Sequence, residues 1–162
     1  NVPNINPFND PKVYRKNEYK KERNHYSKSE DIKNWFQNIY LPIDKLIGQI
    51  INPLSSKIRD LSADPYDQIL MDSFCSYLEK SKSKINKAKI IYTSISSPSL
   101  IKNFSLDLYH CLSQVEDGLN ELERYTMGYV DNYLHDGKSM LSEAKKKRKF
   151  LQATKKEWIS YK

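Results

Sequence analysis

Hydrophobic side chains recur at steps of three and four residues along most of this 162-residue chain. That spacing is typical of amphipathic helices whose apolar faces are buried together. The strongest stripe begins after Ser29, a fair N-cap, and comprises Trp35, Phe36, Ile39, Ile43, Leu46, Ile47, Ile50, Leu54, Ile58 and Leu61. Pro42 and Pro53 interrupt this stripe. Each predicts a kink or a short break, because proline removes a helical hydrogen bond and crowds the preceding turn.

A second helix is predicted over about 65–95. Asp64 is expected to be its N-cap, because a carboxylate accepts hydrogen bonds from the free backbone N–H groups of the first turn. Pro65 is expected to be its first residue, because proline has no N–H group that would be left unpaired there. Ser97-Pro98 repeats this start signal for a third helix.

The third helix carries Tyr125, Tyr129 and Tyr133 on the face that its apolar residues define. We expect this ladder of rings to pack in the core, with the hydroxyls seeking partners at its edge. Gly137 is expected to end the helix in a left-handed conformation, as glycine commonly does. A fourth helix should follow over about 139–160.

Long helices joined by tight turns pack as neighbouring antiparallel rods. The sequence therefore predicts an all-α protein, an up-and-down antiparallel four-helix bundle over 29–162 with a polar, basic N-terminal arm over 1–28. Within the arm, residues 1–12 hold three prolines and four asparagines without a period, which favours extended chain. A domain of this size buries roughly 70% of its unfolded surface, enough to fold without metals or disulfides.

The net charge of +7 is unevenly distributed along the chain. Residues 1–33 carry +3, residues 34–137 carry −3 and residues 138–162 carry +7. Five consecutive cations, KKKRK, lie within the last segment and spread around every side of a helix. Lys147 or Arg148 must therefore fall on the apolar stripe, where we expect it to reach out to solvent or to pair with an acid from another helix.

Such a basic segment indicates an acidic partner surface, unless it is only a solvated helix face. We expect an anionic membrane surface as the partner, with weak, sequence-independent nucleic-acid binding as a further possibility. The candidate residues for binding an anionic surface are Lys145, Lys146, Lys147, Arg148, Lys149, Lys155 and Lys156. The sequence contains no run of about 18 apolar residues and therefore predicts no transmembrane helix.

Metal and catalytic motifs are weak. Glu22-x-x-His25 and Asp107-x-x-His110 have the spacing that di-iron bundles use. His110, however, is expected to point away from the apolar stripe, and the first pair lies in the lysine-rich arm. No glycine-rich phosphate loop and no nucleophile with a base at a known spacing is present. We therefore predict a non-enzymatic protein without cofactor or metal.

Cys75 and Cys111 are predicted to be free thiols and small core residues. Antiparallel packing of their helices places them roughly 12 Å apart along the axis at 1.5 Å per residue. A disulfide needs Cα atoms within about 7 Å of each other.

The composition is rich in Asn, Lys, Ile, Tyr and Ser, with stretches such as NVPNINPFND. With a helical bundle over 30–160, it resembles the malaria-parasite family of the sporozoite microneme protein essential for cell traversal. The resemblance implies a non-enzymatic protein, secreted from a secretory organelle, that acts on a host membrane or host protein during host-cell traversal. The alternative is a small cytoplasmic protein of phage or plasmid origin that binds nucleic acid or a regulatory partner.

Overall fold

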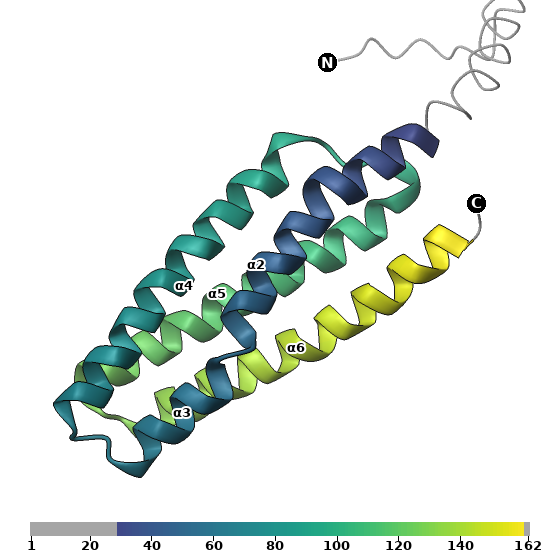
Figure 1. The fold of residues 1–162 in the computed structure, drawn as a ribbon. Coiled ribbons are helices and arrows are strands. Elements are labelled where there is room, and N and C mark those ends of the chain that lie inside the picture. The colour runs from purple at the N-terminus through teal and green to yellow at the C-terminus, as the bar shows by residue number, and fades with distance from the viewer. Residues whose placement is uncertain (1–28, 161–162) are drawn as a thin grey trace, which may run out of the picture.

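The computed structural model describes residues 29–160, and the predicted arm over 1–28 lies outside them. Residues 29–35 are helical. The elements that follow are η2 (Phe36–Tyr40), α2 (Leu41–Ile51), α3 (Leu54–Ala63), α4 (Gln68–Ser94), η3 (Ser99–Ile101), α5 (Lys102–Gly128) and α6 (Asp131–Ser160). Every element in this range is helical, which confirms the all-α class (Figure 1).

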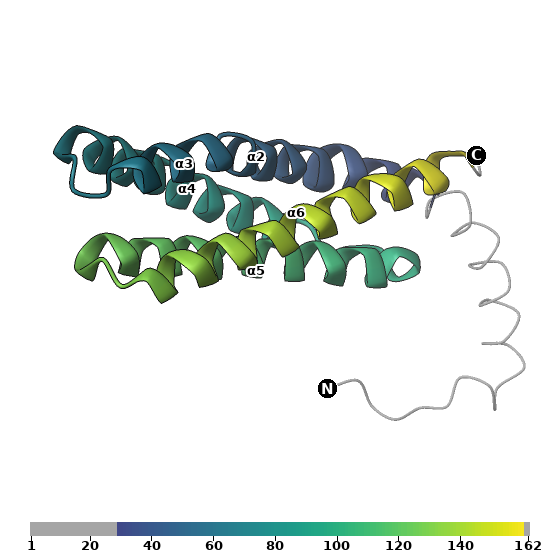
Figure 2. The same ribbon diagram turned by 90° about the horizontal axis from the view of Figure 1, so that it is seen from below.

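Consecutive segments run in alternating directions along one long axis (Figure 1). The chain passes down through α2 and α3, returns through α4, descends through α5 and returns through α6. Figure 2 shows α6 crossing the other helices obliquely, from beside α5 at its start towards α2 at its end. Helix α6 therefore packs mainly on α5 and also contacts α2.

A π-helical turn, η2, ends two residues before the first interrupting proline, Pro42. The N–H of Leu41 donates to the carbonyl of Phe36, five residues back, so the turn is wider than an α-helical one. Such a wide turn suits a chain that cannot donate from Pro42. It places the rings of Phe36 and Tyr40 edge-on to Phe104 of α5, each with a centroid distance of 5.1 Å.

The second interrupting proline, Pro53, lies in the break between α2 and α3. The hydroxyl of Tyr77 on α4 donates to the carbonyl of Ile50 at 2.5 Å and so pairs a carbonyl near the end of α2. The predicted kink or short break is confirmed at Pro53, whereas at Pro42 the chain stays helical and the irregularity is the π-helical turn just before it.

The start of α4 differs from the prediction, because Asp67 rather than Asp64 is the N-cap. Asp67 has the extended backbone of a capping residue, and its Oδ1 accepts from the N–H groups of Ile69 at 2.9 Å and Leu70 at 3.2 Å. Asp64 ends α3 instead and accepts from the N–H of Tyr66 in the turn.

The end of α5 also differs from the prediction. The helix stops at Gly128, and Tyr129 adopts the left-handed conformation with φ of 56°, its N–H donating to the carbonyl of Tyr125. The predicted tyrosine ladder is therefore wrong: Tyr125 is buried, Tyr129 is an exposed helix cap and Tyr133 belongs to α6. The ring of Tyr129 contacts those of Tyr125 and Tyr66, and these contacts help to hold an unusual conformation for tyrosine.

Gly137 does not end a helix, since it lies buried inside α6, where it faces Gly118 of α5. A Cβ added at Gly137 would lie 2.8 Å from the side chain of Leu122 and 2.9 Å from the carbonyl oxygen of Gly118. A Cβ at Gly118 would lie 2.7 Å from Leu141. The two glycines therefore let α5 and α6 approach closely.

Both cysteines are free, as predicted, but they occupy different environments. Cys111 is buried and its thiol donates to the carbonyl of Ala144 at 3.5 Å. Cys75 is exposed, so the expectation that it is a core residue is wrong. Burial raises the pKa of the Cys111 thiol to about 11.

This difference predicts unequal thiol reactivity. In the native protein at pH 8, a water-soluble disulfide reagent should modify Cys75 quickly and Cys111 only as fast as the protein unfolds, because thiolate and access both control the reaction. Counting released thiolate should give one fast thiol in buffer and two in denaturant. Two fast thiols in buffer would show that α6 does not cover Cys111.

Replacing Gly137 by alanine should destabilise the fold by about 1–3 kcal/mol, since the added methyl must displace Leu122 or a backbone carbonyl. The matched control is Gly128→Ala, where the added Cβ meets only Val130 at 3.9 Å. This control should change the free energy of unfolding by less than about 1 kcal/mol. Urea denaturation measures the free energy of unfolding of both variants. Equal values would contradict the close approach of α5 and α6 at Gly137.

Candidate functional site

A groove lies between α3 and the first half of α6 and encloses about 450 Å³. Its floor is apolar and consists of buried side chains from α2, α3 and α6: Ile51, Leu54, Ile58 and Leu141. Leu54 and Ile58 are four residues apart and share one face of α3. Leu141 reaches deep because Gly118 leaves space for it. The packing of α5 against α6 thus shapes the groove.

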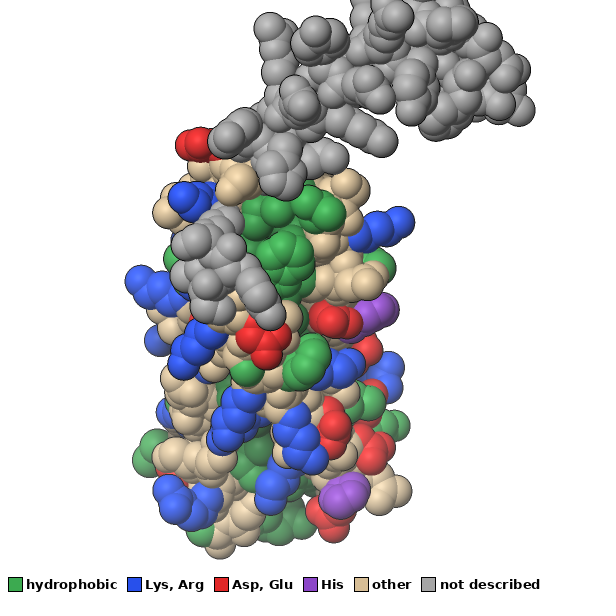
Figure 3. Space-filling model, turned by 90° about the vertical axis from the view of Figure 1, so that its right-hand side faces the viewer, with side chains coloured by type: hydrophobic (Ala, Val, Ile, Leu, Met, Phe, Trp, Pro, Cys, Tyr) green, Lys and Arg blue, Asp and Glu red, His purple; other side chains and the backbone are tan. Residues whose placement is uncertain are grey.

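The rim of the groove is cationic. Arg59 comes from α3, and Lys138 and Lys145 come from α6, seven residues apart and therefore on one helix face. No aspartate or glutamate is among the lining residues. None of the three cations forms an ion pair with a described residue. In Figure 3, Lys and Arg side chains gather on the lower half of the visible face, with hydrophobic side chains between them.

Some cations elsewhere on the surface do have partners. Lys82 pairs with Glu123, and Lys89 pairs with Glu116 at 2.7 Å, so that two bridges join α4 to α5. The contrast with the groove lies in the sequence, because α5 supplies acids opposite the lysines of α4 and neither α3 nor α6 supplies one to the groove lining. The groove therefore retains a positive charge, whereas carboxylates of α5 neutralise Lys82 and Lys89 of α4.

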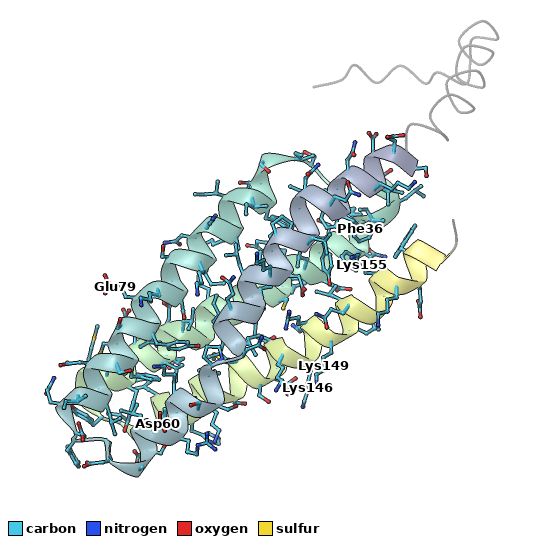
Figure 4. The ribbon with its side chains drawn as sticks, in the orientation of Figure 1. Phe36, Asp60, Glu79, Lys146, Lys149 and Lys155 are labelled. Carbon is cyan, nitrogen blue, oxygen red and sulfur yellow. The ribbon has the colours of Figure 1, made fainter. Side chains whose placement is uncertain are left out.

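The KKKRK run does not form a single surface. Besides Lys145 in the groove, Lys146 forms an exposed pair with Glu143 at 3.1 Å. Lys147, Lys149 and Lys156 are exposed on α6. Figure 4 shows Lys146 and Lys149 on the side of α6 that faces away from α2 and α3.

The remaining two predicted residues point towards α2 and form what we call the α2–α6 polar cluster, which comprises Tyr40, Asp44, Arg148, Gln152 and Lys155. The Nε of Arg148 donates to Oδ1 of Asp44 at 2.8 Å, and Gln152 donates to the same carboxylate at 3.4 Å. The Nζ of Lys155 lies 5.6 Å from the centroid of the Tyr40 ring (Figure 4). The prediction that Lys147 or Arg148 would pair with an acid of another helix is confirmed for Arg148.

Two features show how closely this cluster is packed. A Cβ added at Gly48 would lie 2.6 Å from Nη2 of Arg148, so the glycine makes room for the guanidinium. The hydroxyl of Tyr40 is buried without a hydrogen-bond partner among the described residues. Burial, and next the Asp44 carboxylate, raise the pKa of Tyr40, so the phenol stays protonated. The cluster therefore fastens α6 to α2 and exposes no reactive group.

The two residue pairs with the spacing of a di-iron motif do not form a metal site among the described residues. Within residues 29–160, no group of three His, Cys, Asp or Glu side chains lies close enough to hold an ion. Asp107 and His110 are both exposed on α5, and Glu22 and His25 lie outside the described residues. No helix in this range is long and apolar enough to cross a membrane.

Sequence reasoning missed the groove and two of its three cations, Arg59 and Lys138. A signal for one side of it exists, since Lys138, Leu141 and Lys145 recur at helical spacing and combine charge with an apolar residue. The other wall comes from α3, nearly 80 residues earlier, and no local pattern pairs the two helices.

Removing the guanidinium of Arg148 should test the role of the α2–α6 polar cluster. Arg148→Met leaves the Asp44 carboxylate with only the amide of Gln152 and no cation, and the side chains of Arg148 and Asp44 are only 21% and 18% exposed. We expect a loss of about 1–3 kcal/mol in the free energy of unfolding. Lys146→Met, which breaks the exposed pair with Glu143, should cost less than about 1 kcal/mol. Equal losses in chemical denaturation would contradict this role.

Residues 27–159 match the family model described as the cyanobacterial DnaJ chaperone, C-terminal domain. Comparisons with curated proteins and with solved structures give no significant match.

The match overturns several sequence-based expectations. The resemblance to the sporozoite microneme protein family is wrong, because composition records residue usage and the match rests on residue order over most of the chain. The secreted role in host-cell traversal falls with it, as does the alternative of a phage or plasmid nucleic-acid binder. The match likewise overturns the expected partners, which were an anionic membrane, a host protein or nucleic acid. The chain belongs to the family of cyanobacterial DnaJ chaperone C-terminal domains.

Proposed function

We propose that this chain is a non-enzymatic protein-docking domain of a DnaJ-type chaperone, and that the groove between α3 and α6 receives a segment of a partner protein. The observation that carries the proposal is the family match over residues 27–159. A chaperone acts on other proteins and therefore needs surfaces that bind polypeptide.

The composition of the groove supports this role. Protein interfaces combine an apolar centre with a polar rim, and arginine is enriched in them. The groove has this arrangement, with Leu54, Ile58 and Leu141 on the floor and Arg59 on the rim. A volume of about 450 Å³ admits a few side chains of a partner rather than a folded domain.

The chemistry of the described residues supports a role without catalysis. Three ionisable groups in or beside the core are fastened into the fold: Arg148 and Asp44 bind each other, and the Cys111 thiol is held protonated against a backbone carbonyl. A nucleophile or general base must instead reach a substrate. We further propose a cytoplasmic location, the alternative given in the sequence analysis, which a DnaJ-type family supports.

Site-specific photo-cross-linking tests the docking function. A photoreactive amino acid replaces Ser142 in the groove, and the matched control replaces Ser83, which is exposed on α4 outside the groove. In a cyanobacterial extract, we expect position 142 to form discrete adducts with proteins that mass spectrometry identifies as chaperones or as their unfolded substrates. Position 83 should not form them. No adduct at 142, or the same adducts at both positions, would contradict docking in the groove.

A further inference from the structure

We propose that the segment bound in the groove is an acidic amphipathic helix, with apolar side chains on one face and carboxylates on either side of it. This inference rests on the proposed docking function and adds the chemical class and the conformation of the partner. Three observations carry it: the unpaired cations of the rim, the apolar floor and the helical walls.

The charge of the partner follows from the rim. Arg59, Lys138 and Lys145 flank the floor, no acid lines the groove, and the described part of the chain gives these cations no ion-pair partner. A segment with carboxylates on both flanks of its apolar face would meet a cation from each wall. A basic segment would place like charges against all three, and such juxtaposition is a strong source of discrimination between partners.

The apolar face of the partner follows from the floor. Leu54 and Ile58 on α3 and Leu141 on α6 are buried side chains that nonetheless line the groove. A purely acidic, hydrophilic segment would satisfy the rim but would bring no apolar surface of its own to pack on this floor. Each Å² of apolar surface removed from water on binding makes the free energy of binding more favourable by about 25 cal/mol. Charge alone therefore does not describe the ligand.

The helical conformation follows from the walls. Lys138 and Lys145 lie two turns apart, which is roughly 10 Å along α6. A third helix laid along this length presents anchors at positions i, i+3 or i+4 and i+7, the usual pattern of a helix bound in a groove. An extended segment would bring unpaired backbone N–H and C=O groups onto an apolar floor, and residues 29–160 offer it no sheet edge to pair with. A helix satisfies these groups internally.

Fluorescence anisotropy with designed peptides tests the inference. The probe is a labelled helical peptide of about 18 residues, long enough to form a helix, with leucines at i, i+3, i+4 and i+7 and glutamates on both flanks. Two matched peptides replace the glutamates by lysine or the leucines by serine. The acidic amphipathic peptide should bind saturably, and the other two should bind at least about tenfold more weakly, equivalent to 1.4 kcal/mol.

Charge reversals in the protein locate the binding. Lys138→Glu with Lys145→Glu should weaken binding of the acidic peptide at least about tenfold, because both changes lie on the rim. The control, Lys146→Glu with Lys147→Glu, changes the net charge equally at exposed positions of α6 that do not line the groove, and it should weaken binding less than about threefold. Circular dichroism confirms that both variants remain helical.

Four outcomes would overturn the acidic-helix inference: no binding of the acidic peptide, equal binding of the lysine peptide, equal loss in both double variants, or occupation of the groove by a second copy of the chain. Sedimentation of the protein alone would detect a second copy in the groove as a dimer. The variant with Lys138→Glu and Lys145→Glu should abolish that dimer. If the acidic peptide fails while position 142 cross-links to chaperone proteins, the docking function stands and only the class of partner is wrong.

Discussion

The close approach of α5 and α6 at Gly118 and Gly137 is the contact on which the rest of the arrangement depends. It draws the first half of α6 onto α5 and lets Leu141 fill the space that Gly118 leaves. Further along, α6 crosses towards α2 and is held there by the pairing of Arg148 with Asp44 (Figure 2). Helix α6 is thus attached at two points to two different helices, and the groove lies beside its first half, facing α3.

Cations on one helix serve different purposes according to where their side chains point. Arg148 and Lys155 face α2 and contact Asp44 and the Tyr40 ring, so their charge is used in packing. Lys145, which belongs to the same KKKRK run as Arg148, lines the groove and has no acidic neighbour there. A basic run in a sequence is therefore not a functional unit once it is wound into a helix.

Much of the fold follows from local physics that the sequence displays. Apolar periodicity predicts the helices, the two prolines predict the irregular turns, and five consecutive cations require one to face another helix. The end of α5 is harder to predict, because both Gly128-Tyr129 and Gly137 are plausible places for this helix to end. Packing decides between them, because only a residue without a side chain fits where Gly137 meets α5. The groove could not be predicted, since Arg59 and Lys145 are brought together only by tertiary structure.

The two walls of the groove are synthesised at different times. Helix α3 ends at Ala63 and α6 begins at Asp131, so a ribosome completes one wall long before it starts the other. Until α6 has emerged and closed a loop of this length, the floor residues of α3 have no opposite wall and the rim has only Arg59. A partner that requires both walls therefore distinguishes a finished, folded chain from a nascent or damaged one. By mass action, it also draws the population towards molecules in which α6 is in place.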